Sequence, residues 1–305
     1  MKVVSVINYK GGVGKTTLTA NIASELVERG KRVLVMDLDP QSNLTFSYLK
    51  VDEWKQFYEA DKNIKFWFDS IIDGVRLVPS LKELIVNKNV DIICSHLGLI
   101  DVDIELATGL SAKTDRQYKK NFIKTFSYIR NELDALKKEY DLVLIDCPPN
   151  FSIVTKNALI ASDYYIVPAK LDYLSTLGIN HLRNHVFNLV KDFNSYCDEY
   201  MVKKCEPKFL GVIASMVSLR NNELITAQNY YLNELKRIGI PIFENMMREN
   251  KTIYASAPED GVPVVVHSYN NRTYLEIKSE LKSLVTEFVR KVGIVWKRLW
   301  SCLNL

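Results

Sequence analysis

The sequence has little that would tie it to a metal cluster, a membrane or an extracellular environment. Its five cysteines are odd in number and scattered, with no metal-ligand spacing, which is typical of a reducing cytosol. No apolar run approaches the ~20 residues that a membrane-spanning helix needs. The chain passes from Met1 directly into an apolar strand pattern, without a secretory signal. We therefore expect a cytoplasmic protein.

The sequence also has little net charge and no linker-like segment. The 305 residues carry a formal net charge of only +4, so binding to DNA would need basic residues gathered on one face. No repeat, low-complexity segment or linker rich in Pro, Gly or Ser divides the chain. Hydrophobic residues make up 47% of the sequence, which is ample for a core. We predict one domain over 1–291, followed by a tail over 292–305.

The strongest signal lies within the first thirty residues. A β-branched apolar run at 3–7 indicates a buried strand, and a helix is expected from Lys15 to about Arg29, ending at Gly30. The turn between them reads Lys10-Gly11-Gly12-Val13-Gly14-Lys15-Thr16-Thr17.

Such a turn is suited to phosphate, because backbone N–H groups converge there and the helix dipole adds positive potential. We predict that Lys15 reaches the β- and γ-phosphates of a nucleotide and that the Thr16 hydroxyl ligates Mg²⁺. The alternative is a glycine turn without a ligand. Tyr9 stands where the usual P-loop has its first glycine.

The remaining pattern predicts an α/β fold with a mainly parallel, twisted sheet and helices on both faces. After a second strand at 32–39, further strands are expected at 89–95, 140–147, 164–169, 210–216 and, as a short last one, 240–243. Helical stripes are expected at 121–139, 152–161, 176–195, 222–238 and 274–291. Residues 50–75 are predicted to form helical cover, 75–79 a short strand or a linker, and 101–120 a mobile polar connection.

Acidic residues follow two of these strands. Asp37 and Asp39 end the second strand, at the edge of a parallel sheet where ligands bind. Asp146 follows four apolar residues, which is the form of the acid that holds Mg²⁺ in P-loop nucleotidases. We expect Asp37, which lies nearer the strand, to hold Lys15 or the metal shell.

Three stretches together resemble the motifs of the ParA/MinD family of deviant Walker A ATPases, and most closely its ParA/Soj-type partition ATPases. They are the glycine turn at 10–17, Asp37-Leu38-Asp39-Pro40-Gln41, and Leu144-Ile145-Asp146-Cys147-Pro148-Pro149. A weaker likeness continues at 157–163, 211–220 and 257–261, so that the resemblance covers nearly the whole chain. It implies a P-loop NTPase fold and slow, partner-stimulated hydrolysis of ATP with Mg²⁺.

The resemblance also implies roles for single residues. Lys10 matches the signature lysine that reaches the partner's nucleotide across an ATP-dependent homodimer, and Asp39 the residue that orients the attacking water. The catalytic set is then Lys10, Lys15 and Asp39, and the metal set is Thr16, Asp39 and Asp146. Nucleotide contacts are expected from Lys10, Gly11, Gly12, Val13, Gly14, Lys15, Thr16, Thr17, Met216 and Met247.

ParA-type relatives bind DNA non-specifically and are released by a DNA-bound ParB-like partner, so the resemblance implies plasmid or chromosome partition on the nucleoid. Candidate DNA-binding residues are Arg220, Arg248, Lys251, Arg272 and Lys278.

Two alternatives are considered. In the tail, Trp296, Leu299, Trp300 and Leu303 have helical spacing beside two basic residues. This pattern favours a terminal helix that packs on the domain or on a partner subunit, but it also fits an interfacial helix. A MinD-like ATPase that cycles on membranes or positions a protein cargo is therefore the second hypothesis. A nitrogenase-reductase-like enzyme is disfavoured, because no cysteine pair is placed to hold an iron–sulfur cluster.

Overall fold

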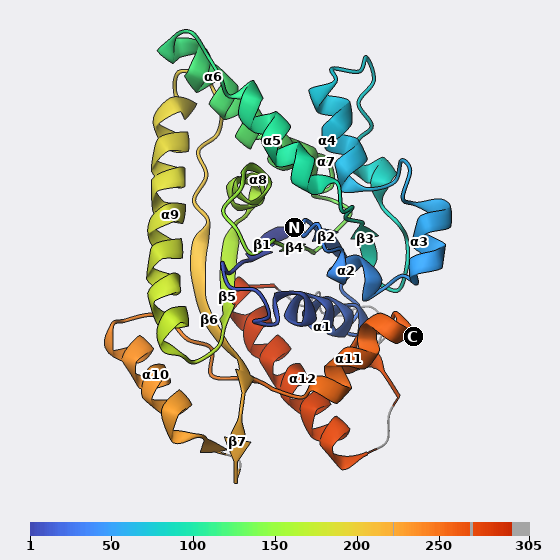
Figure 1. The fold of residues 1–305 in the computed structure, drawn as a ribbon, viewed down its shortest axis with the longest axis vertical. Helices are drawn as coiled ribbons and strands as arrows, with labels where there is room; N and C mark the ends of the chain where they lie inside the picture. Colours follow the sequence, from blue (N-terminus) through green and yellow to red (C-terminus); the bar gives the residue numbers. More distant parts are fainter. Residues whose placement is uncertain (222, 269–270, 295–305) are drawn as a thin grey trace, which may run out of the picture.

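The computed structural model describes residues 1–221, 223–268 and 271–294. Within them, a seven-stranded sheet has the order β3-β2-β4-β1-β5-β6-β9, and every pairing is parallel (Figure 1). Its strands are β1 (Lys2–Val6), β2 (Val33–Asp37), β3 (Asp91–Ile93), β4 (Leu142–Asp146), β5 (Tyr164–Ala169), β6 (Lys208–Val217) and β9 (Met247–Arg248). This is the predicted α/β fold.

Helices cover both faces of the sheet (Figure 1). They are α1 (Lys15–Glu28), α2 (Asn43–Phe46), α3 (Val51–Phe57), α4 (Ile64–Ile72), α5 (Leu99–Gly109), α6 (Asp115–Phe126), α7 (Tyr128–Ala135), α8 (Ile153–Ala161), α9 (Tyr173–Cys197), α10 (Thr226–Arg237), α11 (Lys251–Asp260) and α12 (Arg272–Val292). Short 3₁₀ turns are formed at Leu81–Leu84 and Val264–Val266.

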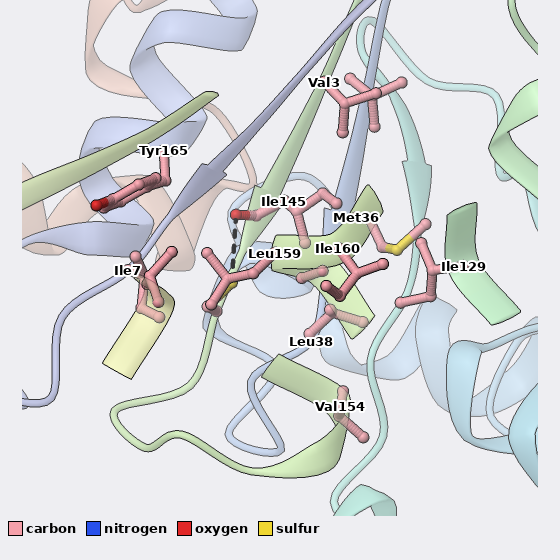
Figure 2. Close-up of a cluster of buried hydrophobic side chains, with 14 of the residues drawn as sticks. Val3, Ile7, Met36, Leu38, Ile129, Ile145, Val154, Leu159, Ile160 and Tyr165 are labelled. Atoms are coloured by element: carbon pink, nitrogen blue, oxygen red, sulfur yellow. Dashed lines mark hydrogen bonds between the residues drawn. The ribbon is translucent and has the colours of Figure 1, made fainter. Parts of the chain in front are cut away.

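The central strands are apolar along their length because both of their faces are buried. Successive side chains of a strand point to opposite faces, so Val3 joins the core beneath α4 to α9, whereas Val4 joins the core beneath α1 and α12. Figure 2 shows the first of these cores, where Ile145 of β4 lies beside Leu159 of α8. Because β1, β2 and β4 are parallel, their carboxyl ends lie at the same edge of the sheet, and the motif residues meet there.

One predicted connection is wrong. Residues 101–120 lie largely in α5 and α6. The Thr114 side chain caps α6 by accepting a hydrogen bond from the Gln117 amide, and α5 buries its inner apolar residues. Local capping and burial therefore outweigh the polar composition of this segment.

The helix predicted over 121–139 is divided at Ser127 into α6 and α7. The helix expected from residue 222 begins only at Thr226, because β7 (Leu219–Arg220) pairs with β8 (Glu223–Leu224) in a small hairpin.

The structure also decides the predictions for the last strand and for residues 50–79. Residues 240–243 make only an isolated bridge, at Ile242, and the edge strand is β9. Residues 75–79 contain neither helix nor strand, which is the linker alternative. Residues 50–75 contain α3 and α4, as expected of helical cover.

At the C-terminal end, Gly293 adopts φ 72° and ends α12. The interfacial helix proposed for the tail falls on residues 295–305, outside the described residues. In the described part of the chain, no helix combines the length and apolar composition needed to cross a membrane.

Candidate nucleotide-binding site

A cavity of about 400 Å³ lies at the carboxyl edge of the sheet, against the glycine turn. Its volume is that of an ordinary small-ligand site. The lining residues are Gly11, Gly12, Val13, Gly14, Lys15, Thr16, Thr17, Ala20, Asn21, Asp39, Gln41, Asn43, Ser47, Pro149, Met216 and Tyr254. A larger cavity of about 680 Å³ lies at the opposite edge and is lined by Lys2, Asp163 and Lys208 among others, but by no motif residue. The smaller cavity is therefore the candidate site.

The glycines of the turn hold conformations that other residues rarely adopt. Gly12 has φ 65° and Gly14 has φ 79°. Gly14 is also the N-cap of α1, where the first N–H groups have no partner within the helix. A phosphate at this position would accept hydrogen bonds from these groups.

The Lys15 ammonium is buried at the base of the turn. Its Nζ donates hydrogen bonds to the carbonyl oxygens of Asn8 and Lys10, both at 3.2 Å. Burial lowers the pKa of Lys15, and the carboxylates of Asp146 and Asp39 oppose that shift. A buried cation whose hydrogen-bond acceptors are neutral carbonyls is ready to take a phosphate oxygen.

Thr16 and Asp146 are in direct contact. The Thr16 hydroxyl donates to Asp146 Oδ2 at 2.6 Å, while Asp146 Oδ1 is buried with no hydrogen-bond partner in the described part of the chain. Burial, and then the charge of Asp37, raise the pKa of Asp146 well above its ordinary value.

This pair fits the predicted Mg²⁺. An orphaned carboxylate oxygen beside a hydroxyl is a donor set that Mg²⁺ accepts, completed by phosphate oxygens and water. No group of three or more His, Cys, Asp or Glu side chains is placed to hold a metal among the described residues. A metal ion at Thr16 and Asp146 would therefore need further ligands from outside the protein.

The two acids at the end of β2, Asp37 within the strand and Asp39 just after it, have different environments. Asp37 Oδ2 accepts hydrogen bonds from the amide and hydroxyl of Thr45, both at 2.8 Å, and burial raises the pKa of Asp37 to about 7. Of the two predicted roles of Asp37, a hydrogen bond to Lys15 is not formed, since Lys15 donates to the Asn8 and Lys10 carbonyls; a role in the metal shell stays a prediction. Asp39 lines the cavity, and its Oδ1 accepts a hydrogen bond from the Gln41 amide at 3.0 Å.

Lys10 is directed away from the cavity that its own turn encloses, since it is not among the lining residues. Its Nζ pairs with Asp172 Oδ2 at 2.6 Å, and both side chains are 38% exposed. Asp172 in turn caps α9 through the Ser175 amide. The neighbouring Tyr9 hydroxyl lies 2.5 Å from His185 Nδ1, so two successive residues of the turn are attached to α9.

The two methionines predicted as nucleotide contacts lie beside the turn in different ways. Met216 lines the cavity. Met247 is 1% exposed, and its Cε would lie 2.5 Å from a Cβ placed on Gly14. Met247 thus packs beneath the loop instead of facing the open cavity.

Sequence reasoning missed Tyr254 of α11, which lines the cavity and whose buried hydroxyl has no hydrogen-bond partner in the part of the chain that the structure describes. No local pattern marks this residue. It reaches the site only through the packing of α11.

The basic residues predicted to bind DNA are only partly available. Arg248 pairs with Glu280 and, at 3.5 Å, with Glu276, which Arg272 also contacts at 3.0 Å. Lys278 donates to the His267 carbonyl at 3.1 Å. The two remaining candidates, Arg220 and Lys251, are exposed.

Comparison with known proteins gives a consistent result. A family model described as an AAA domain matches residues 1–198. The sporulation initiation inhibitor protein Soj of Bacillus subtilis is 29% identical over 284 residues, or 92% of this chain and 98% of that protein. The chromosome partitioning protein ParA of Myxococcus xanthus is 26% identical over 287 residues, or 92% of this chain and 87% of that protein. An ATP complex of Cyanothece McdA has a TM-score of 0.70 at 18% identity, covers 97% of this chain and 98% of that one, and supports the fold alone.

Proposed function

The chain belongs to the ParA/MinD family of P-loop ATPases, with Soj- and ParA-type partition proteins among its relatives, and we propose that it is a partition ATPase working on DNA. In this proposal the cavity beside the glycine turn binds ATP with Mg²⁺. Support comes from the orphaned oxygen of Asp146 beside the Thr16 hydroxyl, together with the uncommitted N–H groups at the start of α1.

In this proposal, each side chain at the cavity has a different role in ATP hydrolysis. Lys15 neutralises the β- and γ-phosphates, and Thr16 with Asp146 holds Mg²⁺, which supplies positive charge against the phosphates when it is bound. Asp39 lines the cavity and orients the attacking water. Positioning and charge stabilisation are most of what phosphoryl transfer asks of a protein, so these four side chains suffice for slow turnover.

We propose further that the ATP-bound chain is a homodimer in which Lys10 contacts the partner's nucleotide. Lys10 lies outside its own cavity, at the N-terminus of α9. The adjoining first turn of α9 exposes three apolar side chains, namely Tyr173, Leu174 and Leu177, which are 60%, 69% and 43% exposed. A second copy seated against Lys10 would cover them.

The dimer would bind DNA non-specifically through Arg220 and Lys251. Arg248 and Arg272 would contribute where Glu276 and Glu280 release them, and Lys278 where it leaves the His267 carbonyl. Pairing two copies doubles the basic surface, and counterion release makes affinity depend steeply on the number of phosphate contacts. A ParB-like partner would stimulate hydrolysis, and the protein would be cytoplasmic and nucleoid-associated.

Sedimentation with plasmid DNA tests this assignment. Binding with ATP but not with ADP, lost at high salt, is expected. Pelleting with liposomes instead, abolished by truncation after Gly293, would favour the membrane-cycling alternative, which depends on Trp296 and Trp300 outside the described residues.

The ATP site itself is tested at Lys15. Lys15→Ala removes the buried ammonium and should abolish ATP binding in a calorimetric titration. The control is Lys137→Ala, which changes a lysine with an exposed side chain and should leave ATP binding unchanged. Unaltered ATP affinity in a folded Lys15→Ala protein would overturn the proposed function.

A further inference from the structure

Helix α5 exposes an apolar stripe that the protein itself does not cover. Leu97, just before the helix, is 61% exposed, and Ile100 and Ile104 are 52% and 64% exposed. Ile100, Ile104 and the exposed Thr108 follow one another at intervals of four residues, so they share one helix face, and Leu97 extends the exposed apolar surface into the turn before the helix. The stripe is about 16 Å long, or three helical turns.

The opposite face of α5 already anchors the helix. Leu99, Val102 and Leu106 are at most 4% exposed and belong to the main core, and α5 packs against α4, α6 and α8 (Figure 1). A helix that is apolar on both faces normally has a partner on each. The outer face of α5 has none in the described part of this chain.

The charge around the stripe indicates the chemistry of that partner. Asp101 and Glu105 are exposed, alternate with Ile100 and Ile104 along the helix, and form no ion pair within the described part of the chain. The segment Leu99–Gly109 contains no lysine or arginine. This surface would repel DNA phosphates and attract a segment with both apolar and basic side chains.

The loop that leads into α5 is bonded to the acids of the candidate site. The Ser95 hydroxyl donates to the Asp39 carbonyl at 2.7 Å, and the Ser95 amide donates to Thr45 Oγ1 at 2.9 Å. Thr45 in turn donates to Asp37. Ser95 is completely buried, so this connection is shielded from water.

A second connection runs from the middle of α5 to the loop after β4. Asp103 Oδ1 accepts a hydrogen bond from the Val154 amide at 2.9 Å, in the first turn of α8. That turn follows the loop after Asp146, the last residue of β4, and Pro149 of this loop lines the cavity. A small shift of α5 would therefore move the backbone at Asp39 and the loop after Asp146.

We propose that the outer face of α5 is the docking surface for a basic amphipathic helix of the protein that activates hydrolysis, and that α5 transmits its binding to Asp39. This inference rests on the proposed ATPase function for its consequence, but the docking itself does not. The partner is defined by its chemistry: apolar residues three and four apart, flanked by lysine or arginine, over about three turns.

The test uses the full chain and a designed probe, a fluorescent helical peptide of about 18 residues with leucines on one face and lysines beside them. A Leu/Glu peptide of the same pattern and a Leu/Lys peptide of scrambled order serve as controls. Binding is followed by fluorescence anisotropy, and ATP turnover is measured in the same samples.

We expect the Leu/Lys peptide to bind, and the Ile100→Ser/Ile104→Ser variant to bind it about tenfold more weakly. The charge-reversed variant Asp101→Lys/Glu105→Lys should prefer the Leu/Glu peptide. A matched change elsewhere, Phe187→Ser on the exposed face of α9, should have no effect.

Equal binding of the ordered and scrambled peptides, or an unchanged preference in the charge-reversed variant, would overturn the proposal. So would a nucleotide-free dimer that Ile104→Ser dissociates, because the stripe would then be a contact between copies. If the peptide binds as expected but ATP is not bound in a separate titration, the docking surface stands and the proposed ATPase function fails. Binding without a rise in turnover, in a chain that does hydrolyse ATP, would refute the transmission to Asp39.

Discussion

At the scale of single residues, the site contrasts two kinds of carboxylate. Asp37 and Asp146 are fully buried and their pKa values are raised by burial, whereas Asp39 lies at the cavity wall with one oxygen held by the Gln41 amide. Asp37 and Asp146 bond neighbouring side chains of the site. Asp39, at the cavity wall, is the carboxylate that a water molecule beside a bound γ-phosphate could reach.

Asp39→Ala should therefore separate binding from hydrolysis. ATP affinity should be retained, while turnover should fall by at least ~100-fold because water is no longer oriented. An ATP-bound dimer should accumulate, measured by light scattering after incubation with ATP. Asp134→Ala, at an exposed position, is the control. A variant that remains monomeric with ATP would contradict the role given to Asp39.

Gly14 gives a prediction about stability that needs no ligand. Gly14→Ala would force a side chain into φ 79° and should cost roughly 1–2 kcal/mol, whereas the contact with Met247 Cε can be relieved by movement of a flexible side chain. Gly11→Ala, with open space and no positive φ, should be nearly neutral. Urea unfolding of the two nucleotide-free variants measures the difference, and equal midpoints would show that the turn is not constrained at Gly14.

These residues also show what the sequence could and could not predict. The sequence predicts Lys15, Thr16 and Asp146 as site residues because each follows a strand or glycine turn that local pattern identifies. It does not predict Tyr254 or the contact of Met247 with Gly14, since both depend on packing between segments more than two hundred residues apart.

At the scale of elements, one buried carboxylate of α12 joins this helix to the segment that leads into β9. Glu287 accepts hydrogen bonds from the backbone amides of Glu244 and Asn245, each at 2.9 Å, and from the Asn245 side chain. Burial alone would raise the pKa of Glu287, but the bonds from Asn245 and Glu244 outweigh it and hold the pKa below its usual value.

Glu287→Ala should destabilise the protein by about 1–3 kcal/mol at neutral pH, because it leaves buried amides without an acceptor. Since the pKa of Glu287 is lowered in the folded state, the stabilisation is present above the unfolded value of about 4.3 and is lost as pH falls through the folded value. The gap between the variant and the parent should accordingly narrow below about pH 4 in urea titrations.

The control for this prediction is Glu244→Ala, whose side chain is 81% exposed and only loosely paired with Arg290. It should change stability little at any pH. A pH-independent gap for Glu287→Ala would show that lost packing, and not the carboxylate, carries the effect.

The elements also differ in how well they could be predicted. Buried strands such as β4 are marked by continuous apolar residues. The sequence predicts a polar connection where α5 and α6 form, because these helices are stabilised mainly by tertiary packing. Thr114 followed by Gln117 is nevertheless a local capping signal that could have identified α6. β9 is only two residues long, too short for any periodicity to reveal.

At the scale of the whole molecule, Lys10 is a cation whose side chain pairs with Asp172 and does not line the cavity beside its own turn. Its exposed pair with Asp172 contributes little to stability, so Lys10→Ala should leave folding and ATP binding almost unchanged. In the proposed dimer it should nevertheless weaken ATP-dependent association, measured by analytical ultracentrifugation with ATP. Lys208→Ala, at the opposite edge of the sheet, is the control, and an unaltered monomer–dimer balance in Lys10→Ala would refute the role across the interface.

The position of β1 at the middle of the sheet has a consequence for synthesis. Lys2 pairs with Leu142, and Val4 pairs with Tyr164, so the first strand made receives its two neighbours only once the chain has reached residues 146 and 169. Such distant pairings form late, and until then the glycine turn has no sheet to hold it in shape. On the proposed function, a nascent chain that carries all of residues 10–17 would thus be unable to bind a nucleotide, and it would gain that capacity only when β4 and β5 have paired on either side of β1.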